Sequence, residues 1–180
     1  MNKTLILLLS SLLLFACCKS DDNMPAPKDQ LPPATQTGEV VFACLVNGEP
    51  YICKGYDMVT AYYQWVNGGY AFIVEARKET HLMWKVDLFN RSNAPIQQGE
   101  VYILNNYSPG YGGGGSVIGG SDNYLEGTTT TATYTGEMTI TRFDIDEEIV
   151  SGIFWFDLEN PWTGETIEIR EGRFDTHFSQ

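Results

Sequence analysis

The stretch Tyr70-Ala71-Phe72-Ile73-Val74-Glu75-Ala76-Arg77 decides the fold class of this chain. Every second residue from Tyr70 to Ala76 is apolar or aromatic, and Glu75 and Arg77 lie between or after them. Alternation with a period of two is typical of a β-strand that buries one face and exposes the other. The stretch therefore predicts a strand over residues 70–77 and a sheet around it.

Several other segments share this pattern. Residues 82–89 and 166–170 also alternate, with Val86 and Leu88 on one face of the first and Ile167 and Ile169 on one face of the second. Residues 149–158 are apolar on both faces, which favours a central strand covered on both sides. Further strands are expected at residues 39–46, 50–54, 57–65, 99–104, 128–135 and 137–144.

Turn-forming residues indicate where consecutive strands are joined by hairpins. Asn47-Gly48 and Asn67-Gly68 are typical of two-residue hairpin turns, and Thr163-Gly164 also has turn composition. No stretch has the apolar stripe of a helix. Short strands at spacings of about 8–15 residues favour an all-β fold. We therefore expect one antiparallel, largely meandering β-sandwich or barrel-like domain.

A glycine-rich segment interrupts the strands between Tyr107 and Tyr124. So many glycines carry a large conformational entropy and leave little side chain to bury. We expect this segment to be a long surface loop.

The N-terminus has the pattern of an export signal. Lys3 is the only charged residue among residues 1–16, and Leu5 to Phe15 form an apolar run broken only by two serines. This pattern predicts a secretory signal peptide, and the run is too short to span a bilayer.

Leu14-Phe15-Ala16-Cys17 resembles the lipobox of bacterial lipoprotein precursors. The resemblance implies that residues 1–16 are removed and that Cys17 is lipidated, which would anchor the chain to a membrane. Cys18 is an alternative acceptor, but it would place a cysteine instead of Ala16 before the cleavage site. An ordinary secretory signal that happens to contain cysteines is the other alternative.

Residues 17–37 are expected to form a flexible tether, because they combine polar residues with Pro25, Pro27, Pro32 and Pro33. The single domain is then expected at residues 38–180. Lys19-Ser20-Asp21-Asp22 is similar to the surface-export signal of Bacteroidetes lipoproteins. The expected location is the outer membrane with display at the cell surface, and a periplasm-facing position is the alternative.

The charge balance excludes some partners. The 11 Lys and Arg face 23 Asp and Glu, a net charge of −12, and loss of Lys3 makes the mature chain one unit more negative. Nucleic-acid affinity depends on basic groups that neutralise phosphates, so no nucleic-acid partner is expected. The same balance argues against a basic patch on anionic lipid.

Four segments together resemble a family of small Bacteroidetes lipoproteins of unknown function. They are the LPPATQTG stretch of residues 31–38, the FACLVNG stretch of 42–48, the IVSGIF stretch of 149–154 and the GRFD stretch of 172–175. The resemblance implies an extracytoplasmic β domain and supplies no catalytic residues.

Cys44 and Cys53 flank the Asn47-Gly48 turn. A two-residue loop would place Cys44 opposite Tyr51 and diagonal to Cys53, whereas a four-residue loop would place the cysteines face to face. Either arrangement keeps both on one side of the hairpin. We expect a disulfide between Cys44 and Cys53, since exported proteins form them, with two buried free thiols as the alternative.

The sequence offers no clear chemistry. His81 and His177 are too far apart for a ligand motif, so no metal or cofactor is expected. The nucleophile-elbow, P-loop and zinc-protease motifs are missing, so we expect no enzyme. Asp157, Glu159, Glu165 and Glu168 are explained as the polar side of edge strands, and the acidic residues from Asp144 to Glu148 as a hairpin turn and not a calcium site.

Aromatic residues supply the remaining candidate site. Flat aromatic rings can stack on sugars or partner surfaces. The candidate ligand rim consists of Tyr62, Trp65, Tyr107, Tyr111 and Tyr124. The expected function is that of a binding or accessory envelope lipoprotein. The alternatives are a glycan-binding lipoprotein that serves polysaccharide capture and a structural or inhibitory envelope protein.

Overall fold

The computed structural model of this chain describes residues 26–78, 85–105, 112–119 and 126–180. These residues form strands and connections, with one short 3-10 turn, η2 (Pro27–Gln30), and without any α-helix. The strands are β1 (Val41–Val46), β2 (Glu49–Lys54), β3 (Val59–Val66), β4 (Gly69–Arg77), β5 (Lys85–Ser92), β6 (Val101–Leu104), β7 (Gly112–Gly119), β8 (Glu126–Thr129), β9 (Gly136–Asp144), β10 (Ile149–Glu159) and β11 (Thr166–His177). The expected all-β class is confirmed.

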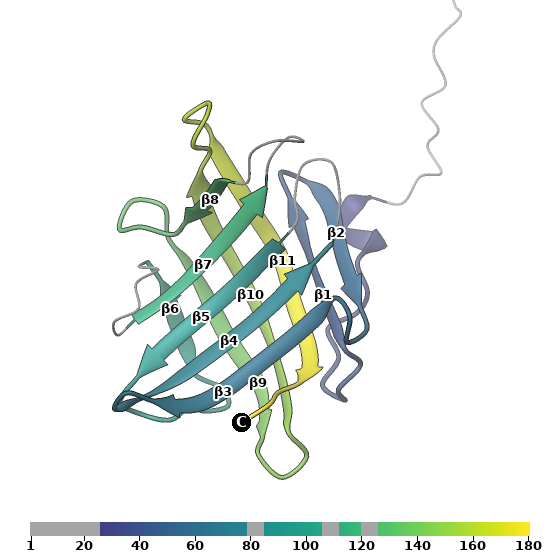
Figure 1. Cartoon of the computed structure of the whole chain (residues 1–180). Coiled ribbons are helices and arrows are strands. Elements are labelled where there is room, and N and C mark those ends of the chain that lie inside the picture. The colour runs from purple at the N-terminus through teal and green to yellow at the C-terminus, as the bar shows by residue number, and fades with distance from the viewer. Residues whose placement is uncertain (1–25, 79–84, 106–111, 120–125) are drawn as a thin grey trace, which may run out of the picture.

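The strands form a single curled sheet in the order β2-β1-β11-β10-β9-β6-β7-β5-β4-β3, with β8 paired to the end of β7 (Figure 1). The neighbours are antiparallel, except that β6 and β7 run parallel. The C-terminal residues bring the two sides together, because Tyr63 N donates to Ser179 O at 2.8 Å and Ser179 N donates to Ala61 O at 3.0 Å. The molecule is therefore a nearly closed barrel, which settles the choice between sandwich and barrel.

The hairpin turns follow the residues that mark them. Asn47 and Gly48 have φ values of 48° and 85°, and Asn67 and Gly68 have values of 48° and 82°. Positive φ at both central residues defines the turn that matches the right-handed twist of the flanking strands. Both predicted hairpins, β1–β2 and β3–β4, are confirmed.

Large apolar side chains fill the inside of the barrel. Phe72, Val74 and Ala76 of β4 are fully buried, as the alternation of residues 70–77 predicts. Phe42 of β1 packs on Phe154 of β10 with ring centroids 5.0 Å apart. The middle of the barrel is therefore a packed core.

The structure corrects the prediction for residues 149–158. Strand β10 does lie centrally in the sheet, but Ile153 and Trp155 are 46% and 37% exposed. Only the inner face of this part of β10 is covered by the core. Its outer face forms the wall of the barrel, where apolar residues remain in contact with solvent.

The structure differs most from the sequence-based expectation in the glycine-rich segment, which was expected to be a loop. Residues 112–119 form the inner strand β7, which pairs with β5, β6 and β8, where the sequence predicts part of a loop. A Cβ on Gly113 would lie 2.5 Å from the carbonyl oxygen of Ile103, and one on Gly115 would lie 3.0 Å from the ring of Phe156. These glycines let neighbouring strands and side chains approach the backbone closely, so their low strand propensity is overridden.

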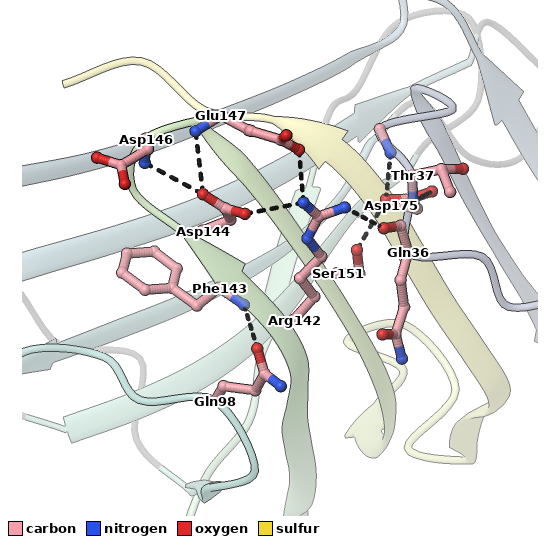
Figure 2. A network of polar contacts seen from close by, with 11 residues as sticks. Gln36, Thr37, Gln98, Arg142, Phe143, Asp144, Asp146, Glu147, Ser151 and Asp175 are labelled. Carbon is pink, nitrogen blue, oxygen red and sulfur yellow. Dashed lines mark hydrogen bonds and ion pairs between the residues drawn. The ribbon is translucent and has the colours of Figure 1, made fainter.

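The predicted tether is not entirely separate from the barrel. Leu31 is buried, and Arg173 Nη1 donates to the carbonyl oxygen of Pro32 at 3.1 Å. Further along, Arg142 Nη1 donates to the carbonyl oxygen of Gln36 at 2.5 Å (Figure 2). Residues from Leu31 onward therefore pack on the wall, ahead of the boundary expected at residue 38.

Asp175 of β11 is the centre of this docking (Figure 2). Its carboxylate is 1% exposed and accepts hydrogen bonds from five groups. The donors are Thr35 Oγ1 at 2.7 Å, Thr37 N at 2.9 Å, Gly38 N at 2.9 Å, Glu39 N at 3.2 Å and Ser151 Oγ at 2.7 Å. Burial would raise the pKa of Asp175, but these donors outweigh it and hold the pKa below the usual range.

The predicted disulfide is wrong, because Cys44 and Cys53 are free, buried thiols. The hairpin has the two-residue loop, so Cys44 pairs with Tyr51 while Cys53 pairs with Phe42. Diagonal residues have Cα atoms about 7–8 Å apart, whereas disulfides need about 4.4–6.8 Å. The diagonal register therefore keeps the sulfur atoms from bonding.

Candidate functional site

The described residues at one end of the barrel line a hollow, which we call the mouth. The β1–β2 turn, the end of β4, the end of β7, strand β8 and the β10–β11 connection surround it, at the top of Figure 1. The mouth contains a cavity of about 510 Å³. Its lining includes Val46, Tyr51, Lys78, Val117, Trp162 and Ile167.

The lower wall of the mouth is apolar and fixed. Tyr51 and Val117 are 4% and 5% exposed and belong to the core cluster. The Tyr51 hydroxyl donates to the carbonyl oxygen of Ala76 at 3.1 Å, which ties β2 to the end of β4. Burial raises the pKa of Tyr51, so its hydroxyl stays neutral at physiological pH.

Lys78 places a positive charge beside this apolar wall. The preceding residue, Arg77, is held on both sides, since its N donates to Met58 O at 2.7 Å and its carbonyl oxygen accepts from Cys53 Sγ at 3.6 Å. Burial raises the pKa of Cys53, while the hydrogen bond with Tyr51 and the charge of Lys78 lower it in part. Lys78 itself follows directly after β4 and contributes to the lining of the mouth.

Trp162 stands at the upper rim of the mouth. It lies in the β10–β11 connection and is 56% exposed. Asn160 Oδ1 accepts from Trp162 N at 2.9 Å and from Thr163 N at 3.2 Å, which closes a local Asx-type turn. A large aromatic ring is thus held at the opening by an ordered turn.

A second hollow of about 500 Å³ lies on the outer wall, where β9, β10 and β11 meet the docked N-terminal segment at Ala34. Trp155 lies in it, with the guanidinium carbon of Arg170 5.5 Å from the ring centroid. Glu137, Glu171 and Arg173 add charged groups around the aromatic ring. This hollow is more polar than the mouth.

The structure separates the described residues of the predicted rim. Tyr62 borders a hollow on the outer face of β3–β5, together with Ile73 and Phe89. Trp65 packs edge-on against Tyr70 at 4.8 Å, next to the β3–β4 turn. Strand β4 runs from there to Arg77, next to Lys78 of the mouth, so Trp65 lies at the end of the barrel opposite the mouth.

The other rim residues, Tyr107, Tyr111 and Tyr124, lie outside the described residues. Strand β7 separates the segment of Tyr107 and Tyr111 from the segment of Tyr124. An eight-residue strand is about 26 Å long, so the chain enters and leaves β7 at opposite ends. The predicted single loop is thus two separate connections.

The residues of the mouth were not predictable from the sequence as a site. They come from five separate parts of the chain, and none forms a motif with its neighbours. The turn signals at Asn47-Gly48 and Thr163-Gly164 were the usable hints, since they place Asn47 and Trp162 at or next to hairpin tips.

Side chains that could ligate a metal are dispersed over the described part of the chain. There, no group of three or more His, Cys, Asp or Glu side chains is placed to hold a metal ion. His177 Nδ1 is 3.1 Å from the Tyr56 hydroxyl, and His81 lies outside the described residues. The described ranges also contain no helix long and apolar enough to cross a membrane.

No family model, curated protein or solved structure matches this chain in comparisons with known proteins.

Proposed function

We propose that this chain is an outer-membrane lipoprotein, displayed at the cell surface, that binds a small molecule in the mouth of its barrel. The observation that carries the proposal is the cavity of about 510 Å³ that the described residues line at one end of a barrel with a packed core. Ligand sites are typically about 300–1,000 Å³, largely apolar, and often lie in the mouths of β-barrels. The lipid anchor at Cys17 is part of the proposal and rests on the lipobox-like Leu14 to Cys17.

The groups at the mouth favour binding over catalysis. Cys44 and Cys53 are the thiols of the nearby hairpin, and burial raises the pKa of both. Both thiols therefore stay protonated at neutral pH, whereas the thiolate is the reactive form. The buried Tyr51 hydroxyl is likewise kept neutral.

Native mass spectrometry of the mature chain, extracted from the envelope of a Gram-negative host, tests binding. Ile167 lines the mouth and is half-buried, so Ile167→Trp should fill the cavity. Ile153→Trp makes the same exchange on the outer wall, where Ile153 is 46% exposed. We expect a small-molecule adduct on the wild type and on Ile153→Trp, and none on Ile167→Trp. No adduct on the wild type, or an equal adduct on Ile167→Trp, would contradict the proposal.

The anchor is tested separately with an alkyne-bearing palmitate fed to cells. Cys17→Ala should lose the label and leave the membrane fraction, and Cys18→Ala should keep both. Replacing Asp21 and Asp22 with alanine should lower protease accessibility on intact cells if the acidic segment directs surface export. Unchanged accessibility would favour the periplasm-facing alternative and leave the anchor intact.

Glycan binding is a second candidate, and the outer hollow favours it. Trp155 offers an exposed aromatic ring beside the charged groups of Arg170, Glu137 and Glu171, a combination suited to stacking and hydrogen bonding with a sugar. In a glycan-array screen of the mature chain, Trp155→Ala should abolish any signal. Trp65→Ala, which removes another exposed tryptophan elsewhere, should preserve it. A signal that survives Trp155→Ala would exclude this hollow.

A further inference from the structure

We infer that the mouth binds a long-chain carboxylic acid, with the carboxylate at Lys78 and the hydrocarbon chain against Ile167 and Trp162. This inference rests on the proposed function and names the class of ligand for the same site. Three features carry it: the position of a charge on the wall, the apolar character of the remaining surface, and the place where the N-terminal segment joins the barrel.

The positive charge of Lys78 in the cavity wall favours an anionic ligand. The cavity lining contains two charged residues among those described, Lys78 and Glu49. Glu49 is exposed at the start of β2, whereas Lys78 is half-buried and makes no ion pair with another of the described residues. A partly desolvated ammonium is stabilised by a charged acceptor, and a carboxylate supplies one.

The backbone that carries Lys78 is fixed relative to the wall. The backbone just before it is tied to β2 by the bonds from Tyr51 to Ala76 and from Cys53 to Arg77. Its Cα therefore moves with the barrel wall. The ammonium lies on a flexible four-carbon side chain, so it can turn toward a ligand head group from this fixed point on the wall.

The remaining surface suits a hydrocarbon chain. Val46 and Ile167 pack against the core from the mouth, and Val117 belongs to the core itself. Trp162 is held at the opening by the Asn160 turn. An apolar chain placed here removes apolar surface from water on both sides of the contact.

The N-terminal segment places the mouth near a lipid source. Turn η2 packs beside β2, whose residues Glu49 and Tyr51 line the cavity (Figure 1). Cys17 precedes Ala26, the first described residue, by nine positions. Nine residues span at most about 30 Å, so a barrel anchored at Cys17 keeps this side within reach of the membrane, from which an acyl acid could enter.

Photolabelling of the mature chain in isolated envelopes tests the inference. The probes are a palmitic acid that carries a diazirine in its chain and the matching hexadecanol with the same diazirine. Peptide mapping locates the adducts and separates them from the N-terminal peptide that contains Cys17. The variants are Lys78→Met, which removes the charge, Lys78→Arg, which keeps it, and Ile167→Trp, which fills the cavity.

We expect the acid probe to label mouth peptides of the wild type and of Lys78→Arg. Lys78→Met should lower acid labelling about tenfold, the loss expected for one charge-assisted hydrogen bond, without changing the weak alcohol labelling. Equal acid labelling of Lys78→Met and wild type, or stronger labelling by the alcohol, would overturn the inference. A native adduct that is present on the wild type and chemically neutral would also overturn it, while the proposed binding function would stand.

Discussion

At the residue scale, Asp175 shows how one carboxylate joins distant parts of the chain. Its donors lie in residues 35–39 and in β10, more than a hundred positions away for the former. A buried carboxylate is stable only when its oxygens are satisfied by hydrogen bonds or counter-ions. The docking of the N-terminal segment and the burial of Asp175 therefore depend on each other.

Asp175→Asn should destabilise the protein by about 3 kcal/mol. The amide places an N–H₂ donor where the backbone N–H groups or the Ser151 hydroxyl need an acceptor. Denaturant unfolding of the mature chain measures the loss, and limited proteolysis should show new cleavage between Leu31 and Gly38. Asp146→Asn makes the same exchange at an exposed site and should change stability little. Similar stabilities for the two variants would contradict the role given to Asp175.

The pKa of Asp175 also predicts a pH dependence. The folded pKa lies below that of an unfolded aspartate, which is about 3.9. The contribution of Asp175 to stability is therefore present above about pH 4 and is lost as the pH falls through the lower, folded value. Protease sensitivity of residues 31–38 should rise below about pH 4 in the wild type. In Asp175→Asn the segment should be sensitive at every pH, so a matching acid transition in that variant would exclude Asp175 as the titrating group.

At the element scale, β7 shows why some strands can be predicted from sequence and others cannot. The stretch from Tyr70 to Arg77 was predictable because alternating burial leaves a period of two in its residue types. Strand β7 leaves no such signal, since Gly113 and Gly115 are required by the Ile103 carbonyl and the Phe156 ring. Contacts with residues far along the chain override local propensity there.

Gly113→Ala should destabilise the barrel by several kcal/mol, since its Cβ would lie 2.5 Å from a backbone oxygen that cannot move independently. Gly127→Ala lies on the adjacent strand β8, where the nearest atom is 3.5 Å away, and should be nearly neutral. Thermal unfolding of both variants measures the difference. A loss of similar size in both, or in neither, would argue against the placement of β7 inside the sheet.

The β1–β2 hairpin gives a prediction about its thiols. Cys44 and Cys53 are diagonal in the hairpin and free, so protein purified without reductant should have both thiols available after denaturation. Alkylation in denaturant followed by peptide mass mapping should modify both. In the folded protein both should resist alkylation, because they are buried and their pKa values are raised. A peptide pair linked through the two sulfur atoms would restore the disulfide expected from sequence.

At the scale of the whole molecule, the candidate site arises only when the barrel closes. The mouth combines the β1–β2 turn, the ends of β4 and β7, strand β8 and the β10–β11 connection. No local sequence pattern unites them. Of the predicted aromatic rim, the described residues Tyr62 and Trp65 lie on the outer face and at the end opposite the mouth. The strand periodicity predicted the class of fold, but the order of the strands determines which residues share the cavity.

Fluorescence quenching by a brominated stearic acid tests the central claim, binding of a long-chain acid in the mouth, most directly. Bromine quenches tryptophan only at close contact, and Trp162 is the tryptophan that the structure places at the mouth among those described. We predict saturable quenching of the mature chain in lipid nanodiscs, lost in Trp162→Phe and in Ile167→Trp and kept in Trp155→Phe. Quenching that persists unchanged in both Trp162→Phe and Ile167→Trp would place the ligand elsewhere and contradict the account.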